Sequence, residues 1–242
     1  MSQLDLSLEA SVSARHLSFV ETGRSRPSSE MVLHLADRLD IPLRDRNQLL
    51  LAAGYAPVHG QRGLDEPEME PVREALELIL AGHEPYPAVV VDRHWGMVAG
   101  NRAVALLTDG VAPELLEPPL NVLRVALHPE GLAPRILNLA EWRGHLLERL
   151  GRQAVITGDP ALAVLLEELA GYPGGGLSQA SEEPYGNIAV PLRLRAGDAS
   201  ELAFISTVTT FGTATDVTVA ELAIESFFPA DELTARALRS AP

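Results

Sequence analysis

The first 55 positions alternate between apolar residues at helical spacing and short polar breaks. The pattern predicts four short helices, at residues 3–10, 14–21, 29–39 and 42–53. Ser13 and Ser28 stand directly before two of these helices, where a serine hydroxyl caps the free backbone N–H groups, and Gly54 closes the last one. This stretch therefore reads as a small all-α domain.

The pattern changes after residue 71, where β-branched runs alternate with helical stretches. Strands are predicted on either side of Asp92–His94 and, near the C-terminus, at residues 187–195, 201–210 and 217–225. Helices are predicted at residues 72–81, from 102, across 113–171 with breaks at 128–131 and 158–160, and at 227–239. The order strand, strand, helices, strand, strand, strand is typical of an α+β PAS-like sensor fold with about five antiparallel strands.

Between the two patterns lies the sequence "APVHGQRGLDEPEMEP", which mixes proline, glycine and charge without any periodicity. Such composition is typical of a linker. The sequence thus predicts a helical domain at residues 1–55, a linker at 56–67 and the α+β domain at 68–242.

The helical domain has the features of a helix-turn-helix DNA reader. That motif needs a small residue in its first helix, a residue that tolerates positive φ in the turn, and apolar anchors on the second helix. Ser7 and Ser11 fill the first two places, and the anchors are Val12, Leu17 and Val20. The alternative is a small helical bundle with no role in DNA binding.

Nine residues of this domain are predicted to contact DNA. Those expected to reach base edges from the start of the recognition helix are Ala14, Arg15, His16, Ser18 and Phe19. Those expected to contact phosphates are Gln3, Ser13, Arg24 and Arg26.

Charge restricts where DNA could bind. The chain of 242 residues has a formal net charge of −14, and all 19 basic residues are arginine. Residues 1–64 hold seven arginines and seven acids, so the whole negative charge belongs to the remainder. Because an acidic surface repels the phosphate backbone, only the N-terminal part is suited to approach DNA.

Composition excludes several other classes. With 46% apolar and 21% charged residues, no cysteine, no signal peptide and no apolar run of about 20 residues, the sequence indicates a cytoplasmic protein that does not enter membranes. Nucleophile elbows, P-loops and dinucleotide-binding glycine motifs are missing, and no two of the seven histidines are four residues apart. We therefore expect no catalysis, no cofactor and no metal site.

Two long motifs at the N-terminus and three in the second domain resemble a known family. "VSARHLSFVETGRSRPS" and "LADRLDIPLRDRNQLLLAAGYAP" resemble XRE-family helix-turn-helix regulators of the MmyB-like branch. The similarity continues in "YPAVVVDRHW", "NVLRVALHPEGLAPRILNLAEWRGHLLERL" and "TTFGTATDVTVAELAIESFFPADE". The resemblance implies a PAS-like sensor domain, with fatty acids as the ligand class, joined to an operator-binding domain.

The sequence departs from that family in two ways. Members carry a complete helix before the motif, whereas this chain opens inside the second helix, and they carry alanine and glycine where Ser7 and Ser11 stand. We expect that the native start lies upstream of Met1. Without the first helix, four leucines are expected to be partly bare, namely Leu4, Leu8, Leu33 and Leu50.

A ligand site is predicted around the sequence "HPEGLAPRILN". A fatty-acid carboxylate requires cationic or amide donors, and its tail requires an aliphatic slot. The predicted head-group residues are His128, Arg135 and Asn138, and the predicted lining residues are Trp95, Trp142, Phe204 and Phe211. The alternative is that the polar residues cap helices and the aromatic residues are ordinary core.

These observations predict a one-component transcriptional regulator, active as a homodimer on a double-stranded DNA operator and responsive to a small hydrophobic ligand such as a fatty acid. The rival hypothesis is a ligand-binding or protein-interaction module that has lost DNA binding through N-terminal truncation.

Overall fold

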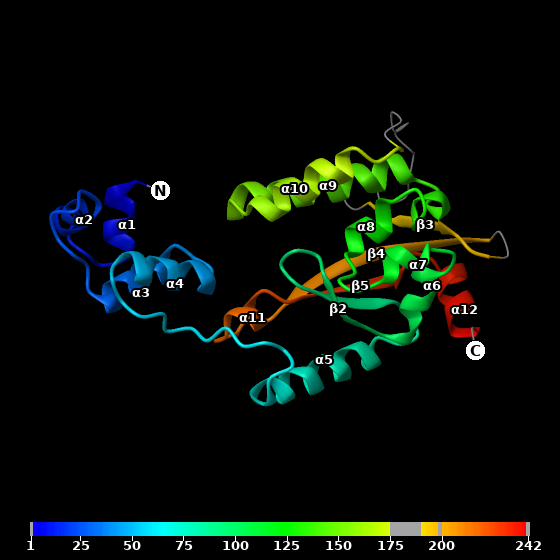
Figure 1. Cartoon of the computed structure of the whole chain (residues 1–242), viewed down its shortest axis with the longest axis horizontal. Helices are drawn as coiled ribbons and strands as arrows, with labels where there is room; N and C mark the ends of the chain where they lie inside the picture. Colours follow the sequence, from blue (N-terminus) through cyan, green and yellow to red (C-terminus); the bar gives the residue numbers. More distant parts are fainter. Residues whose placement is uncertain (1, 175–189, 198–199, 241–242) are drawn as a thin grey trace. The chain divides into compact units, whose positions relative to one another are not determined.

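The computed structural model describes residues 2–174, 190–197 and 200–240, and the chain forms two compact units (Figure 1). The first unit consists of residues 1–72 together with Phe211–Glu221. The second consists of Arg73–Thr210 and the residues from Leu222 onward. Each unit is described by itself below.

The first unit is helical, as predicted. Its helices are α1 (Gln3–Glu9), α2 (Ala14–Glu21), α3 (Ser29–Arg38), α4 (Leu43–Ala52) and α11 (Val217–Ala220). Ser13 caps α2, because its hydroxyl accepts the backbone N–H of His16 at 3.1 Å, and Ser28 caps α3 by accepting that of Met31 at 3.2 Å. Both predicted helix starts are confirmed.

The predicted bare leucines are only partly confirmed. Leu4 and Leu8 on α1 are 61% and 72% exposed, and Leu33 on α3 is half-buried. The prediction is wrong for Leu50, which is fully buried. Helices α3 and α4 pack against each other, so Leu50 takes part in the core of the unit and does not depend on a further helix.

The second unit contains a five-stranded antiparallel sheet in the order β2-β1-β5-β4-β3. Its strands are β1 (Ala88–Val91), β2 (Met97–Gly100), β3 (Leu192–Arg195), β4 (Glu201–Thr210) and β5 (Ala223–Pro229). β5 lies in the middle, with Val90 of β1 opposite Ile224 and Ser206 of β4 opposite Phe227. This is a PAS-like sheet, and the α+β fold with five antiparallel strands is confirmed.

The remaining helices of this unit are α5 (Glu70–Gly82), α6 (Ala105–Thr108), α7 (Pro113–Leu116), α8 (Val122–Leu127), α9 (Leu139–Thr157), α10 (Pro160–Ala170) and α12 (Glu232–Ser240). Helices α9 and α10 lie side by side and, with α8, cover one face of the sheet, while α5 lies across the sheet from them (Figure 1). The main apolar cluster fills the space between the sheet and α8, α9 and α10. Leu150 of α9, Leu169 of α10 and Phe204 of β4 are fully buried in it.

Of the three strands predicted near the C-terminus, the one at 201–210 is confirmed as β4, and the other two need correction or fall partly outside the described residues. Residues 187–189 of the first lie outside them. The third was expected at 217–225, but residues 217–220 form the helix α11 and β5 begins at Ala223. The side chain of Asp216 accepts the N–H of Thr218 at 2.9 Å, and this cap outweighs the strand preference of β-branched residues. Phe227–Pro229, expected at the start of the last helix, instead end β5.

Candidate DNA-binding and ligand-binding sites

The turn between α1 and α2 has the geometry that the motif requires. Ser7 is 6% exposed, and its hydroxyl donates to the carbonyl of Leu4 at 2.8 Å, so the small polar side chain is satisfied inside the helix pair. Ser11 has φ = 51°, and the N–H of Val12 donates to the carbonyl of Ser7 at 2.9 Å. The predicted roles of Ser7 and Ser11 are confirmed.

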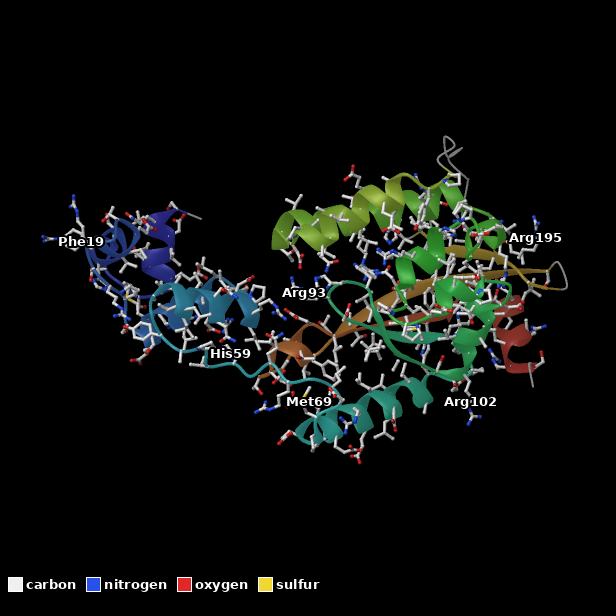
Figure 2. The ribbon with its side chains drawn as sticks, in the orientation of Figure 1. Phe19, His59, Met69, Arg93, Arg102 and Arg195 are labelled. Atoms are coloured by element: carbon white, nitrogen blue, oxygen red, sulfur yellow. The ribbon has the colours of Figure 1, made fainter. Side chains whose placement is uncertain are left out.

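Helix α2 presents an accessible face. Leu17 is 2% exposed and fixes the inner side, while Arg15 is exposed and its guanidinium carbon lies 5.3 Å from the centroid of the Phe19 ring. Phe19, labelled on α2 in Figure 2, is half-buried. Ala14, His16 and Ser18 are half-buried. Contact of these residues with base edges stays a prediction.

The four predicted phosphate ligands differ in their surroundings. The amide of Gln3 donates to the carboxylate of Glu21 at 2.5 Å, and Ser13 caps α2. Arg24 is exposed in the loop after α2. Arg26 donates to the carbonyls of Ala53 and Gly54 at 2.8 and 3.0 Å, which satisfies carbonyls at the end of α4. Phosphate binding by these four residues stays a prediction.

The second unit contains a partly open apolar cavity of about 70 Å³ between the sheet and helices α6, α8 and α9. Among the lining residues in the described part of the chain, only Thr108 and Glu225 carry a polar side chain, apart from the indole of Trp142. The lining residues used below are Thr108, Ala126, Trp142, Glu225 and Phe227. A space with this lining favours an apolar ligand.

Glu225 is the charged group of this cavity. It is 5% exposed and lies on β5, with one carboxylate oxygen 3.4 Å from the guanidinium of Arg149 on α9. Burial raises the pKa of the Glu225 carboxyl, and the nearby Arg149 opposes that rise. Arg149 in turn stacks on the Trp95 ring at 4.4 Å, and the Trp95 indole donates to Gln153 at 2.8 Å.

The four predicted aromatic lining residues fall in different places. Trp142 lines the cavity. Phe204 is fully buried and packs edge-to-face on Phe227, a lining residue, with 6.4 Å between ring centroids. Trp95 is buried beneath Arg149. Phe211 belongs to the first unit, so it lies outside the unit that contains the cavity.

The predicted head-group residues make contacts within the protein. Arg135 donates to the carbonyls of Leu106, Asp109 and Arg195 at 3.1, 2.7 and 3.2 Å.

Asn138 donates to the carbonyl of Pro191 at 2.8 Å and accepts the N–H of Arg193 at 3.1 Å. The Nδ1 of His128 accepts the N–H of Glu130 at 3.1 Å. None of His128, Arg135 and Asn138 is among the cavity-lining residues, and their contact with a ligand stays a prediction.

A second polar cluster joins the β1–β2 turn to the start of α10. The carboxylate of Asp159 accepts hydrogen bonds from Arg93 and, at 2.9 Å, from Nε2 of His94, and it caps α10 by accepting the N–H of Ala161 at 2.9 Å. Figure 2 shows Arg93 in the turn. The hydrogen bond from His94 is the largest cause that lowers the pKa of Asp159 to about 2.

Sequence reasoning missed Glu225 and Arg149. The available signal was a single acid in the apolar run "LAIESFF", where strand alternation places Glu225 on the same face as Phe227. Outside the cavity, the second unit also has an open surface groove of about 560 Å³ lined by Ala81, Glu84, Pro85, Arg102, Ala103, Leu106 and Leu238.

Comparisons with solved structures give distant likenesses. A LOV protein of Rhodobacter sphaeroides is 14% identical over 66% of this chain and 69% of its own, with a TM-score of 0.32. An RNA-binding light-oxygen-voltage receptor is 16% identical, with a TM-score of 0.29, and this chain spans 54% of its length and is itself 98% covered. No curated protein matches the chain significantly.

Family models assign both parts of the chain. A helix-turn-helix model matches residues 1–45, and the model of the MmyB-like transcription regulator ligand binding domain matches residues 72–241. No helix in the described part of the chain is both long and apolar enough to cross a membrane. Because the second model covers more than half of the sequence, the chain belongs to the family defined by the MmyB-like transcription regulator ligand binding domain, preceded here by a helix-turn-helix.

Proposed function

We propose that the protein is a ligand-responsive transcriptional regulator that reads a double-stranded DNA operator with α2. The observation that carries this proposal is the α1–α2 turn, in which Ser11 adopts the left-handed conformation and leaves the Arg15 and Phe19 side of α2 accessible. The family match of both units supports a regulator with a sensor domain. The place of action that we propose is the cytoplasm.

The DNA-reading role predicts a residue-specific loss of affinity. Duplexes enriched from a random library on the full chain would be titrated by fluorescence anisotropy at two or more salt concentrations. Arg15→Ala is expected to weaken binding about 10- to 100-fold, because a side chain contacting a base edge contributes roughly 1–3 kcal/mol. Arg102→Ala removes an exposed arginine of the second unit and serves as the matched control.

Two outcomes contradict this role. One is equal affinity of the parent and Arg15→Ala for every enriched duplex. The other is failure to enrich any duplex, which favours the rival hypothesis of a module without DNA binding. The logarithm of the association constant for DNA should also fall linearly with the logarithm of salt concentration, because phosphate contacts release counterions.

We further propose that the cavity of the second unit binds an aliphatic ligand, with a fatty acid as the class that the family resemblance implies. The apolar lining supports an aliphatic chain. At about 70 Å³ the cavity holds a short apolar group, whereas small-molecule sites usually measure roughly 300–1,000 Å³. A long acyl chain therefore requires α8 and α9 to move away from the sheet.

This ligand role predicts a co-purifying or exchangeable aliphatic compound. Native mass spectrometry of the full chain would detect it, and cis-parinaric acid fluorescence would measure exchange. Ala126→Phe fills the cavity and is expected to lower probe affinity at least tenfold, whereas Ala105→Phe changes an exposed residue of α6 and should leave affinity unchanged. Absence of both a bound mass and probe binding in the parent contradicts the role.

The proposed assembly is a homodimer. One recognition helix reads few base pairs, and helix-turn-helix proteins commonly place two such helices in successive major grooves. Light scattering of the complex with an enriched duplex is expected to give two chains per site.

A further inference from the structure

The segment Phe211–Glu221, called the connecting segment below, runs between β4 and β5 but belongs to the first unit. The chain passes between the units three times, after Val72, after Thr210 and after Glu221. The DNA-binding unit is therefore built from two distant stretches of sequence. The motif "TTFGTATDVTVAEL", which includes the connecting segment, has no role in either of the proposed sites.

A bidentate ion pair joins the end of the connecting segment to α4. Arg44 Nε lies 2.6 Å from one carboxylate oxygen of Glu221, and Arg44 Nη2 donates to the other at 2.8 Å. The Arg44 and Glu221 side chains are 29% and 21% exposed. Arginine–carboxylate pairs of this fork geometry fix orientation as well as distance. Arg44 also donates to the side chain of Gln61 at 3.3 Å.

The start of α11 is held by the stretch that follows α4. The N–H of Val217 donates to the carbonyl of Gly60 at 2.8 Å, and Arg62 pairs with Asp216 at 3.0 Å. Val217 is 1% exposed. Asn47 of α4 fixes this stretch from the other side, because its amide donates to the carbonyl of His59 at 2.9 Å.

The same piece of chain continues into the wall of the cavity. A single residue, Leu222, separates Glu221 from β5, and it is 2% exposed. Three residues after Leu222, Glu225 is part of the cavity lining, and Phe227 follows on the same face of the strand. β5 is also the central strand of the sheet, hydrogen-bonded on both edges, so it moves as part of the sheet.

We propose that the connecting segment is the element through which occupancy of the cavity changes the DNA-binding unit. Displacement of β5 by a bound group alters the tension on Glu221 and so the position of Arg44 on α4. A ligand shifts DNA affinity only by the difference between its binding free energies for the two arrangements of the Arg44–Glu221 pair. The inference rests on the proposed ligand role of the cavity, while its test does not require a ligand.

Hydrogen–deuterium exchange of the full chain tests the route. Ala126→Leu adds bulk to the cavity and acts as a perturbation of β5 without any ligand. Exchange would be followed in β5, in α4 and at residues 58–62, in the parent and in the Glu221→Gln background. Glu232→Gln removes one partner of an exposed ion pair with Arg236 on α12 and is the matched control.

With an intact connecting segment, Ala126→Leu is expected to change exchange at least twofold both in β5 and in α4. In the Glu221→Gln background the change in β5 should persist while that in α4 falls to less than half, and Glu232→Gln should preserve both. The proposal is overturned if α4 responds equally in the Glu221→Gln background, or if it never responds while β5 does.

Val122→Ile, a milder change in the cavity lining, replaces Ala126→Leu if that variant does not fold or leaves β5 unchanged. The same outcomes then apply. If neither substitution changes hydrogen exchange in β5, a change in the cavity does not affect this strand and the proposal fails. Failure of the parent to bind cis-parinaric acid would count against the ligand role and leave these exchange results to be judged separately.

Discussion

At the scale of single residues, backbone conformation marks the places that organise each unit. Ser11, Asp40 and Trp95 are the described non-glycine residues with positive φ, at 51°, 49° and 67°. Such a conformation costs on the order of 1 kcal/mol for a residue with a side chain. Trp95 keeps the positive φ because its indole N–H donates to Gln153 and its ring packs under the guanidinium of Arg149. The turn thereby positions Arg149 beside Glu225 of the cavity.

Ser11→Gly is expected to stabilise the first unit. Glycine adopts φ = 51° without the Cβ clash, so the free energy of unfolding should rise by about 0.5–1 kcal/mol, reduced by the greater freedom of glycine in the unfolded chain. Urea unfolding followed at the first unit measures it. Ser25→Gly, in the following loop, is the control and should be neutral or destabilising. A lower stability of Ser11→Gly would show that the serine side chain outweighs the backbone strain.

The candidate sites were only partly predictable at this scale. Ser7, Ser11, Ser13 and Ser28 were placed correctly because caps and turns depend on neighbours within a few residues. The contacts of Arg135 with three carbonyls and the burial of Glu225 depend on chain segments far apart in sequence. Local patterns carry no signal for the partners of Arg135, and for Glu225 strand alternation gives its face of the strand but not its partner Arg149.

At the scale of elements, the end groups of helices decide where segments meet. Asp159 caps α10 and at the same time binds Arg93 and His94 of the β1–β2 turn, so one carboxylate joins a helix pair to a hairpin. Likewise Arg124 of α8 forms two hydrogen bonds with Glu168 of α10 at 2.8 and 2.7 Å. These pairs fix α10 to the β1–β2 turn and to α8, and α8 lines the cavity.

Asp159→Ala is expected to lower the free energy of unfolding by about 1 kcal/mol at pH 7, the usual cost of losing an N-cap. The pKa of this carboxyl is lowered to about 2 from 3.8, so its stabilising effect is present above pH 3.8 and is lost as the pH falls through 2. The difference between parent and variant should therefore shrink between pH 4 and pH 2.

Urea titrations at several pH values measure this difference. Glu148→Ala, which removes an exposed ion pair with Arg152 four residues away, is the control and should change stability by a few tenths of a kcal/mol at most. A difference that stays constant down to pH 2 would contradict the role of the Asp159 charge.

The prediction of strands and helices succeeded where the period of the apolar positions and the length of the segment indicated the same type of element. The strand β4 has the predicted bounds, and α9 ends at the predicted break, although it begins at Leu139 and not directly after the break at 128–131. Residues 217–220 were misassigned because "VTVA" has strand composition and its two valines are buried in alternation, as in a strand, while the side chain of Asp216 caps a helix. The sequence predicted the order of elements along the chain, whereas the strand order β2-β1-β5-β4-β3 within the sheet comes from the structure.

At the scale of the whole molecule, the first unit depends on residues that come late in the chain. Val217 and Val219 are 1% and 9% exposed, and full burial of a valine contributes roughly 1.5–3 kcal/mol as an upper estimate. A unit of this size has a total stability of about 4–12 kcal/mol. The connecting segment therefore supplies a sizeable part of the stability of the DNA-binding unit.

A fragment of residues 1–72 is accordingly expected to unfold at a lower temperature than the same residues in the full chain. Circular dichroism would follow the fragment, and hydrogen exchange in α4 would report on the full chain. A peptide of residues 211–221 added to the fragment should raise its melting temperature, and the same peptide with Glu221→Gln should raise it less. Equal stability of the fragment and the full chain would contradict the contribution of the connecting segment.

The two-part construction of the DNA-binding unit also has a consequence for biosynthesis. The 138 residues 73–210 are translated between its two stretches, which takes roughly 7–28 s at 5–20 residues per second. During this interval α4 on the ribosome lacks Glu221 as the partner of Arg44. The nascent protein thus completes its DNA-binding unit only after four strands of its sensor sheet have been made, and it does so before the central strand β5 has been added.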